Sequence, residues 1–84
     1  MSERLVINFT PAEGAVIRML GLVERRGYEL RGLAMEEQAN GASLILDVEP
    51  RDPSRRVDVV ARQLDRLIEV NNVSIVTGTQ AAAA

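Results

Sequence analysis

The side chains that most enzymes use for covalent chemistry are absent from this sequence. The chain contains neither histidine nor cysteine, which removes the common proton shuttle, the thiolate nucleophile and the most frequent metal ligands. A serine nucleophile normally needs an adjacent base, and no histidine is available to activate Ser2, Ser43, Ser54 or Ser74. These residue types argue against nucleophilic catalysis.

The carboxylates are equally unsuited to catalysis. Glu36 and Glu37 are adjacent, but neighbouring residues on a strand point to opposite faces, so the pair cannot flank one substrate bond. Asp47 and Glu49 share one strand face without a third ligand nearby in sequence, which is too few oxygens for a hard cation. We therefore expect solvated strand residues, no metal site and no cofactor in this chain.

A backbone cleft remains as the candidate for binding. Gly14 lies near the start of a predicted helix, Gly21 within it, and Gly27 at its junction with the next strand. A glycine at the positive end of a helix lets a ligand carboxylate approach the backbone N–H groups. Alternatively, Gly14 and Gly21 only let a neighbouring element come close, and both interpretations hold if that neighbour is a second copy. The segment indicates a regulatory module.

Composition restricts the class of protein further. The chain has 84 residues, which suits one domain with a two-layer core. It is 46% hydrophobic but 2% aromatic, so the core must be aliphatic. The net charge is −2 and all ten basic residues are arginines interleaved with acids, which argues against nucleic-acid binding. Without a span of about 20 apolar residues or a leader pattern, we expect a soluble, cytoplasmic protein and no membrane contact.

The first third of the chain reads as a strand followed by a helix. Apolar residues alternate with polar ones over 3–9, the pattern of a strand with one buried face. Thr10 followed by Pro11 predicts the helix start, and Glu13 would complete a capping box. Gly27 predicts the helix end in a left-handed cap.

The middle of the chain reads as a β-hairpin. A strand beginning at Tyr28 changes phase, and a bulge near Gly32 would return its apolar residues to one face. Asn40-Gly41 is a strong hairpin-turn signal, and alternating apolar residues follow over 42–48.

The last third reads as a second helix and a final strand. Pro50 and Pro53 end the preceding strand, and Asp52 or Ser54 can cap the helix. Its apolar stripe runs from Val57 to Ile68 at helical spacing. Asn71-Asn72 then predicts a turn into a strand over 73–77.

This element order predicts an α+β, ferredoxin-like βαββαβ sandwich, in which a four-stranded antiparallel sheet carries two helices on one face. We expect residues 1–79 to form the single domain and 80–84 to be a disordered tail. Val6, Ile45 and Val76 would point to the uncovered sheet face, where exposed apolar residues commonly mark a partner surface.

Other functions use the same fold but need residues that this chain lacks. RNA-recognition modules need aromatic residues on central strands, whereas the only aromatics here are Phe9 and Tyr28. Metal chaperones need paired cysteines. A small acylphosphatase-like enzyme would need a phosphate loop to accompany Arg18 or Arg25, and no such loop is present.

Residues 13–30 resemble a known family. Their Gly-Ala-Val-Ile-Arg-Met-Leu-Gly-Leu-Val-Glu-Arg-Arg-Gly-Tyr-Glu-Leu run, from Gly14 to Leu30, is similar to the motif of ACT domains in the small regulatory subunits of acetolactate (acetohydroxyacid) synthase. The Gln-Leu-Asp-Arg-Leu-Ile-Glu-Val segment at 63–70 resembles a second motif of that family. The resemblance spans residues 4–77, and the length and Phe-Thr-Pro start resemble the short, valine-insensitive type.

The resemblance implies a non-catalytic subunit that binds and activates the acetolactate synthase large catalytic subunit in branched-chain amino acid biosynthesis. Thiamine diphosphate, Mg and FAD would belong to that large subunit. The resemblance also implies a homodimer. An amino-acid effector would lie between two ACT domains, against the loop before the first helix and the start of the second strand.

The effector-binding residues implied by the resemblance are Pro11, Gly14, Ala15, Glu29 and Leu30. Pro11 and Glu29 stand where the family has asparagines. Proline has no N–H to donate, and a carboxylate repels a ligand carboxylate, so we expect no strong valine inhibition through this site. The alternative is a free-standing ACT-domain sensor that binds an amino acid or related ligand between protomers, with Glu29 selecting a cationic group.

Overall fold

The computed structural model describes residues 3–77 and contains six regular elements. They are, in chain order, β1 (Glu3–Phe9), α1 (Ala15–Arg25), β2 (Tyr28–Gln38), β3 (Gly41–Pro50), α2 (Val57–Asp65) and β4 (Val70–Thr77). The expected tail at 80–84 lies outside the described residues. The βαββαβ order predicted from the sequence is confirmed.

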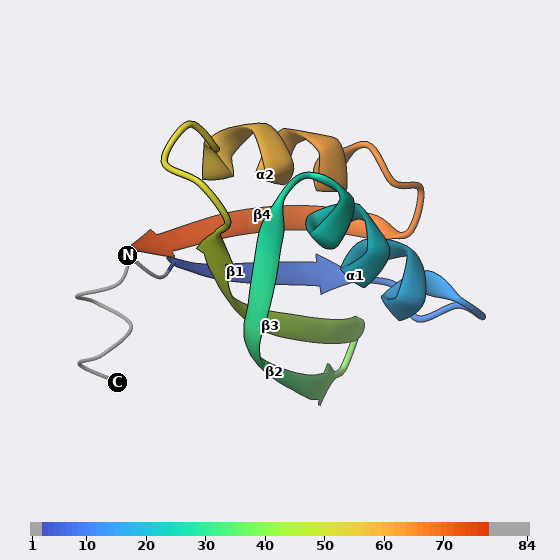
Figure 1. The fold of residues 1–84 in the computed structure, drawn as a ribbon. Helices are drawn as coiled ribbons and strands as arrows, with labels where there is room; N and C mark the ends of the chain where they lie inside the picture. Colours follow the sequence, from blue (N-terminus) through green and yellow to red (C-terminus); the bar gives the residue numbers. More distant parts are fainter. Residues whose placement is uncertain (1–2, 78–84) are drawn as a thin grey trace.

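The strands form one antiparallel sheet in the order β2-β3-β1-β4, with both helices on the same face (Figure 1). Strands β1 and β3 lie in the centre, and β2 and β4 are the edges. The ferredoxin-like sandwich is therefore confirmed. Neighbouring strands that run in opposite directions place the β1 end, the α1 start and the β2–β3 hairpin at one end of the sheet.

The core lies between the sheet and the two helices and is aliphatic, as the composition predicts. The sheet contributes Leu5, Ile7, Leu44, Leu46 and Val48, and the helices contribute Met19, Val23, Val60 and Leu64, all of them almost fully buried. Both aromatic residues, Phe9 and Tyr28, are also buried there. Each fully buried side chain of this size stabilises the folded state by roughly 1.5–3 kcal/mol.

The bulge predicted near Gly32 is present. The β2–β3 register shifts between Leu30 and Gly32, so that Arg31 is the additional residue. The shift aligns Leu33 with Leu46 and Met35 with Leu44 on the helix side of the sheet. No helix of the described chain covers this end of β2, however, and Leu33 and Met35 remain 54% and 52% exposed.

The start of α1 differs from the sequence prediction. The helix begins at Ala15, and its N-cap is Gly14 with φ 78°, without a side-chain cap. Thr10 instead donates its backbone N–H to the Glu69 carbonyl over 2.8 Å, which ties the β1 end to the residues before β4. Residues 10–13 are an exposed loop, so the predicted Thr10 cap and Glu13 capping box are wrong. The predicted end is confirmed, because Gly27 has φ 90°.

The second helix and last strand also have different bounds from those predicted. Arg56 is the N-cap of α2, whereas Asp52 accepts a hydrogen bond from the Ser54 N–H within the preceding turn. The helix ends at Asp65, so Ile68 leaves the apolar stripe and is 94% exposed. Strand β4 begins at Val70, so both asparagines lie inside it: Asn72 pairs with Asn8 of β1, and Asn71 is the additional residue at a register shift.

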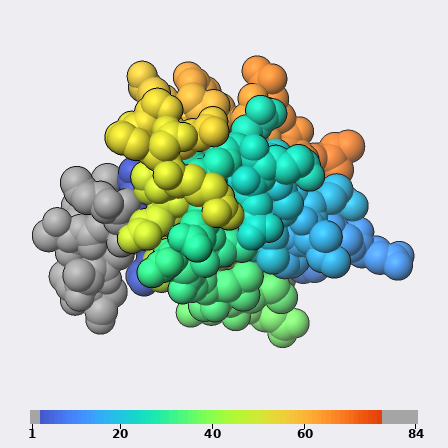
Figure 2. All heavy atoms as spheres, in the orientation of Figure 1, coloured from blue at the N-terminus to red at the C-terminus, as the bar shows by residue number. Residues whose placement is uncertain are grey.

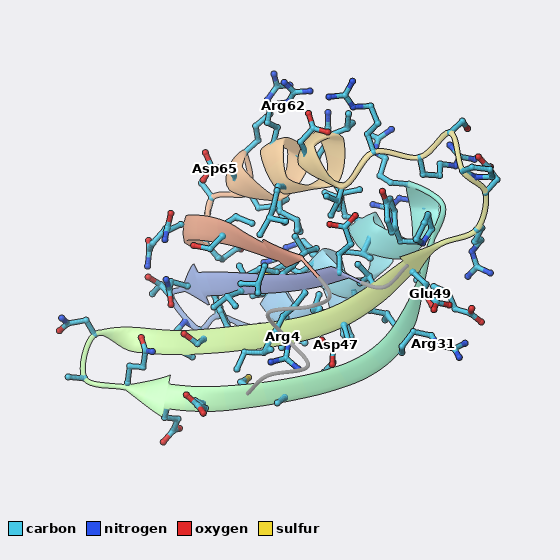
Figure 3. All side chains as sticks on the ribbon, turned by 90° about the vertical axis from the view of Figure 1, so that its left-hand side faces the viewer. Arg4, Arg31, Asp47, Glu49, Arg62 and Asp65 are labelled. Carbon is cyan, nitrogen blue, oxygen red and sulfur yellow. The ribbon has the colours of Figure 1, made fainter. Side chains whose placement is uncertain are left out.

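The uncovered face of the sheet carries polar rows on either side of an apolar one. Val6 lies opposite Ile45, which in turn lies opposite Ala34 of β2. On one side, Arg4 Nε donates to Asp47 Oδ1 over 2.8 Å, and Figure 3 shows the two side chains near each other. On the other side, Ser43 donates to Asn8 over 2.6 Å and accepts from Gln38. Val6 and Ile45 therefore point to the uncovered face, as predicted.

No helix of the described residues is both long and apolar enough to cross a membrane.

Candidate functional site

The candidate effector site begins with the loop between β1 and α1. Pro11 lies beside Gly41 at the hairpin end of the sheet. The backbone closes with a 3.0 Å hydrogen bond from the Ala15 N–H to the Ala12 carbonyl, and Gly14 accepts from the Arg18 N–H. Because Gly14 has a positive φ, it turns the chain into the helix at a conformation that L side chains rarely adopt.

The guanidinium of Arg18 covers this glycine. A Cβ atom added to Gly14 would lie 3.1 Å from Arg18 Nη1. The same side chain donates to the Glu13 carbonyl over 3.4 Å and forms an ion pair with Glu69. The start of α1 at Gly14 is therefore covered by a cation that is held by a carboxylate from another segment.

Arg18 was not among the residues predicted for the effector site. The sequence does contain a signal for it, because Arg18 follows Gly14 by four residues and side chains at that spacing meet on a helix surface. A glycine at one position leaves room for the arginine to fold back over the helix start. The same spacing recurs at Gly21 and Arg25, where an added Cβ would lie 3.3 Å from Arg25 Nη1.

Glu29 and Leu30 lie away from the loop that holds Pro11, Gly14 and Ala15. Glu29 lies opposite Glu49 at the other end of the sheet, and Arg31 Nη1 approaches its Oε1 atom to 3.2 Å. Figure 3 shows Arg31 and Glu49 together at that end. One chain therefore brings three of the five predicted residues together and leaves the other two at the far end of β2.

Exposed apolar side chains occur on both α1 and β2. Ile17 on α1 is 76% exposed, and Leu33 and Met35 are half exposed on the helix side of β2. The outer edge of β2 has no strand partner within residues 3–77. Exposed apolar side chains beside an open strand edge are a typical protein-binding surface.

Three groups that lose a proton on ionisation have pKa values shifted further from neutral pH. Hydrogen bonds from Ser54 lower the pKa of Asp52, and a hydrogen bond from Arg56 lowers the pKa of Asp58. Burial raises the pKa of Tyr28, which keeps its phenol neutral near pH 7. A general acid or base works best with a pKa near the operating pH, so these three shifts favour structural roles.

The metal hypothesis is also tested by geometry. Asp47 pairs with Arg4, and Glu49 lies 3.8 Å from Arg31 Nε, so each carboxylate faces a guanidinium. Within residues 3–77, no group of three or more acidic, histidine or cysteine side chains is arranged to hold a metal ion.

The fold and the site together define a small α+β binding module with a covered helix start and an open strand edge. A family model described as the ACT domain matches residues 11–73, and the chain belongs to this family. It is therefore a regulatory, non-catalytic domain of the kind found in regulatory parts of various enzymes. No curated protein sequence matches the chain.

Solved structures show the same fold. The ACT domain from the GTP pyrophosphokinase of Chlorobium tepidum superposes with a TM-score of 0.74 at 10% identity, covering 90% of this chain and 97% of that one. The C-terminal domain of the MgtC protein from Mycobacterium tuberculosis gives 0.75 at 15% identity, covering 99% and 93%. Formyltetrahydrofolate deformylase from Burkholderia mallei gives 0.69 at 16% identity, where this chain covers 28% of that longer chain and is itself 90% covered.

Proposed function

We propose that this ACT domain is the non-catalytic small subunit of acetolactate synthase, which binds and activates the large subunit in branched-chain amino acid biosynthesis. The observation that carries the proposal is the motif over residues 13–30. It folds as one continuous unit from the glycine start of α1 to β2, bounded by Gly14 and Gly27, both at positive φ. In this proposal thiamine diphosphate, magnesium and FAD reside in the large subunit.

The open edge of β2 supports a homodimer. An antiparallel pairing of two β2 strands about a two-fold axis at Ala34 places Leu33 of one copy opposite Met35 of the other. These side chains are half exposed in the single chain, and the pairing joins them into one apolar stripe on the helix side. Such isologous interfaces are the commonest way in which identical chains associate.

The same register is favourable for the charged residues of β2. It places Glu36 of one copy opposite the bulge that contains Arg31 in the other, on the uncovered side of the sheet. Opposite charges on facing strand positions stabilise a pair, whereas like charges oppose it. If the pairing of the two β2 strands shifted by one residue, Leu33 would lie opposite residues that point to the uncovered face. Both the apolar and the charged residues therefore favour the register centred on Ala34.

This dimer would also complete the effector site. Antiparallel pairing reverses the second β2, so that its Glu29 and Leu30 approach the end of the sheet that carries Pro11 and Gly14 of the first copy. The site would then bring Leu30 of one copy, which pairs with Val48 on the helix side of the sheet, toward the helix start of the other copy, where the Arg18 guanidinium suits the carboxylate of an amino acid. Glu29 pairs with Glu49 on the uncovered side, so its carboxylate would border the site from the other face of the sheet.

We assign the uncovered sheet face to the large subunit. The two helices cover the other face of the sheet, and the second copy would cover the β2 edge. Its central row of Ala34, Ile45 and Val6 is apolar and flanked by polar pairs. An apolar centre with a polar rim is the common arrangement of protein interfaces.

Co-purification with a cognate large subunit tests the function. We expect a stable complex and a higher rate of acetolactate formation than the large subunit alone gives. The exposed Ser74, opposite Val6 on the uncovered face, is changed to arginine, and the exposed turn residue Ala39→Arg is the matched control. Ser74→Arg should lose both complex and activation, and Ala39→Arg should keep both. Absence of a complex with the unmodified chain would reject the proposal.

The alternative is a free-standing amino-acid sensor, and the cation over Gly14 is the observation that favours it. Calorimetry with a panel of amino acids, without any large subunit, tests this function. The sensor requires saturable binding that Arg18→Gln weakens and that Arg66→Gln, at the end of α2, leaves unchanged. Lack of binding by every amino acid would exclude the sensor and leave the subunit assignment intact.

A further inference from the structure

A second group of arginines lies at the opposite end of α1 from the effector site. Arg26 is the C-cap of α1, and Arg55 and Arg56 immediately precede α2. The two segments are joined by a 2.9 Å hydrogen bond from the Arg51 N–H to the Gly27 carbonyl. Figure 2 shows the end of α1, in teal, beside the β3–α2 loop, in yellow.

A cavity of about 250 Å³ opens between these segments. Its lining consists of Arg26, Ser54, Arg55, Arg56, Val59 and Val60. Three of the six residues are cationic and none is acidic, although the chain as a whole has a net charge of −2. The lining therefore concentrates positive charge in a protein that is otherwise slightly acidic.

The arginines are held in place by contacts outside the cavity. Arg26 Nη2 donates to Gln63 Oε1 over 3.3 Å. Arg55 Nε lies 3.3 Å from Asp52 Oδ2, and its side chain lies against Gly27, where any side chain would collide with it. Each guanidinium carries five N–H donors, so these contacts orient the groups and leave further donors for a ligand.

The charges do not cancel at this site. Arg56 donates to both carboxylate oxygens of Asp58 over 3.1 Å, and Asp52 balances Arg55. Within residues 3–77, no carboxylate lies within 4.0 Å of Arg26, whose positive charge remains uncompensated by an ion pair. An anion in the cavity would be attracted by the positive charge of Arg26 and could accept hydrogen bonds from the N–H groups of Arg55 that have no other acceptor.

The other walls restrict the ligand. The Ser54 hydroxyl lines the cavity but already donates its hydrogen bond to Asp52. It therefore cannot donate to a ligand at the same time. Val59 and Val60 form an apolar wall. The cavity is smaller than the roughly 300–1,000 Å³ of drug-sized sites, which suits one oxyanion group with a short apolar portion.

We propose that this cavity is a binding site for a small molecule that carries a phosphate or carboxylate group. The oxyanion would accept from Arg26 and Arg55, whose planar guanidinium groups match both anions, and the remainder would contact Val59. This site lies at the other end of α1 from Gly14, and it is independent of the proposed subunit function.

Titration of the isolated full chain tests the site, with pyrophosphate as the phosphate probe and citrate as the carboxylate probe. Both are followed by calorimetry and by amide NMR shifts at constant ionic strength, because salt screens such contacts. We expect saturable binding, with shifts centred on Gly27 and residues 54–57. Arg26→Gln and Arg55→Gln should each weaken binding by about tenfold, the loss of one charged hydrogen bond.

Arg66→Gln is the matched control, because it removes the same charge at the far end of α2 and should change affinity less than about twofold. Thermal unfolding confirms that each variant is folded before titration. Tighter binding of pyrophosphate or of citrate identifies the preferred oxyanion. An equal loss in all three variants would show attraction by net charge alone and would overturn the proposal, as would the absence of saturable binding by both probes.

Discussion

Gly14 and Gly21 are each followed four residues later by an arginine that folds over them, but the two glycines have different backbone conformations. Gly14 is the N-cap of α1 at φ 78°, whereas Gly21 lies in the helix interior. The left-handed conformation costs an L residue roughly 1–2 kcal/mol. A helix interior favours alanine over glycine by up to about 1 kcal/mol. The same substitution should therefore have opposite effects at the two positions.

We predict that Gly14→Ala lowers the free energy of unfolding by about 1–2 kcal/mol. The cost arises from backbone strain and from the approach of the new methyl group to Arg18. Gly21→Ala should raise the free energy of unfolding by up to about 1 kcal/mol, because the exposed end of Arg25 can move away. Urea unfolding of both variants measures the difference. Two changes of the same sign would contradict this account of the α1 start.

At the scale of elements, the first turn of α2 depends on one carboxylate. Arg56 provides no side-chain cap, whereas Asp58 in the first turn pairs with Arg56 and, over 3.6 Å, with Arg62. A hydrogen bond from Arg56 lowers the pKa of Asp58, and the charges of both arginines lower it further. A negative charge at this end also interacts favourably with the helix dipole.

The lowered pKa of Asp58 determines the sign of the pH effect. A carboxyl group whose pKa is lower in the folded state stabilises the fold above its unfolded pKa of about 3.9, and this contribution is lost as the pH falls through the folded value. We predict that Asp58→Asn lowers the melting temperature near neutral pH and that this difference shrinks as the pH falls below the unfolded pKa. Calorimetry across this range measures it.

Asp65→Asn is the control for that measurement. Asp65 lies at the other end of α2, where a negative charge opposes the helix dipole, and within residues 3–77 no arginine lies within 4.0 Å of its carboxylate. Figure 3 shows Asp65 and Arg62 on the solvent side of α2. Its removal should leave the melting temperature near neutral pH unchanged or slightly raised. An equal loss from both substitutions would rule out a specific role for Asp58.

At the scale of the whole molecule, the two edges of the sheet differ in character. The β4 edge lies beside α2, whereas β2 presents Leu33 and Met35 next to an unpaired edge on the helix side. A single chain leaves these residues exposed because β2 is an edge strand, which has a neighbouring strand on one side only. A second copy would cover them.

We predict that the chain is a dimer in solution and that Leu33→Asp weakens its self-association by about 100-fold or more, because an unpaired buried charge costs several kcal/mol. Ile68→Asp is the matched control, since Ile68 is even more exposed but precedes β4 on the other side. Sedimentation equilibrium measures both variants. A monomeric unmodified chain, or equal effects of the two substitutions, would refute the β2 interface and the composite effector site.

Local patterns were sufficient for most of the fold. Alternation over 3–9 and 42–48, the Asn40-Gly41 turn and the phase change at Gly32 each report on a few neighbouring residues, so they predict strands, hairpin and bulge. The helix starts were less predictable. Thr10 and Ser54 are both good caps by residue type, but the Thr10 hydroxyl accepts from Asn71 Nδ2 and the Ser54 hydroxyl donates to Asp52 instead. Such competition from distant or turn partners is not visible in local sequence.

The sequence by itself determined the class of the fold, the aliphatic core and the glycine positions that bound α1, because periodicity and left-handed turns depend on adjacent residues. Only the tertiary structure decided which distant residues meet around them. It gave Arg18 its partner Glu69, placed Glu29 at the other end of the sheet from Pro11, and brought Arg26 beside Arg55. These relations involve residues that are far apart in the chain, and they depend on strand order and helix packing rather than on spacing.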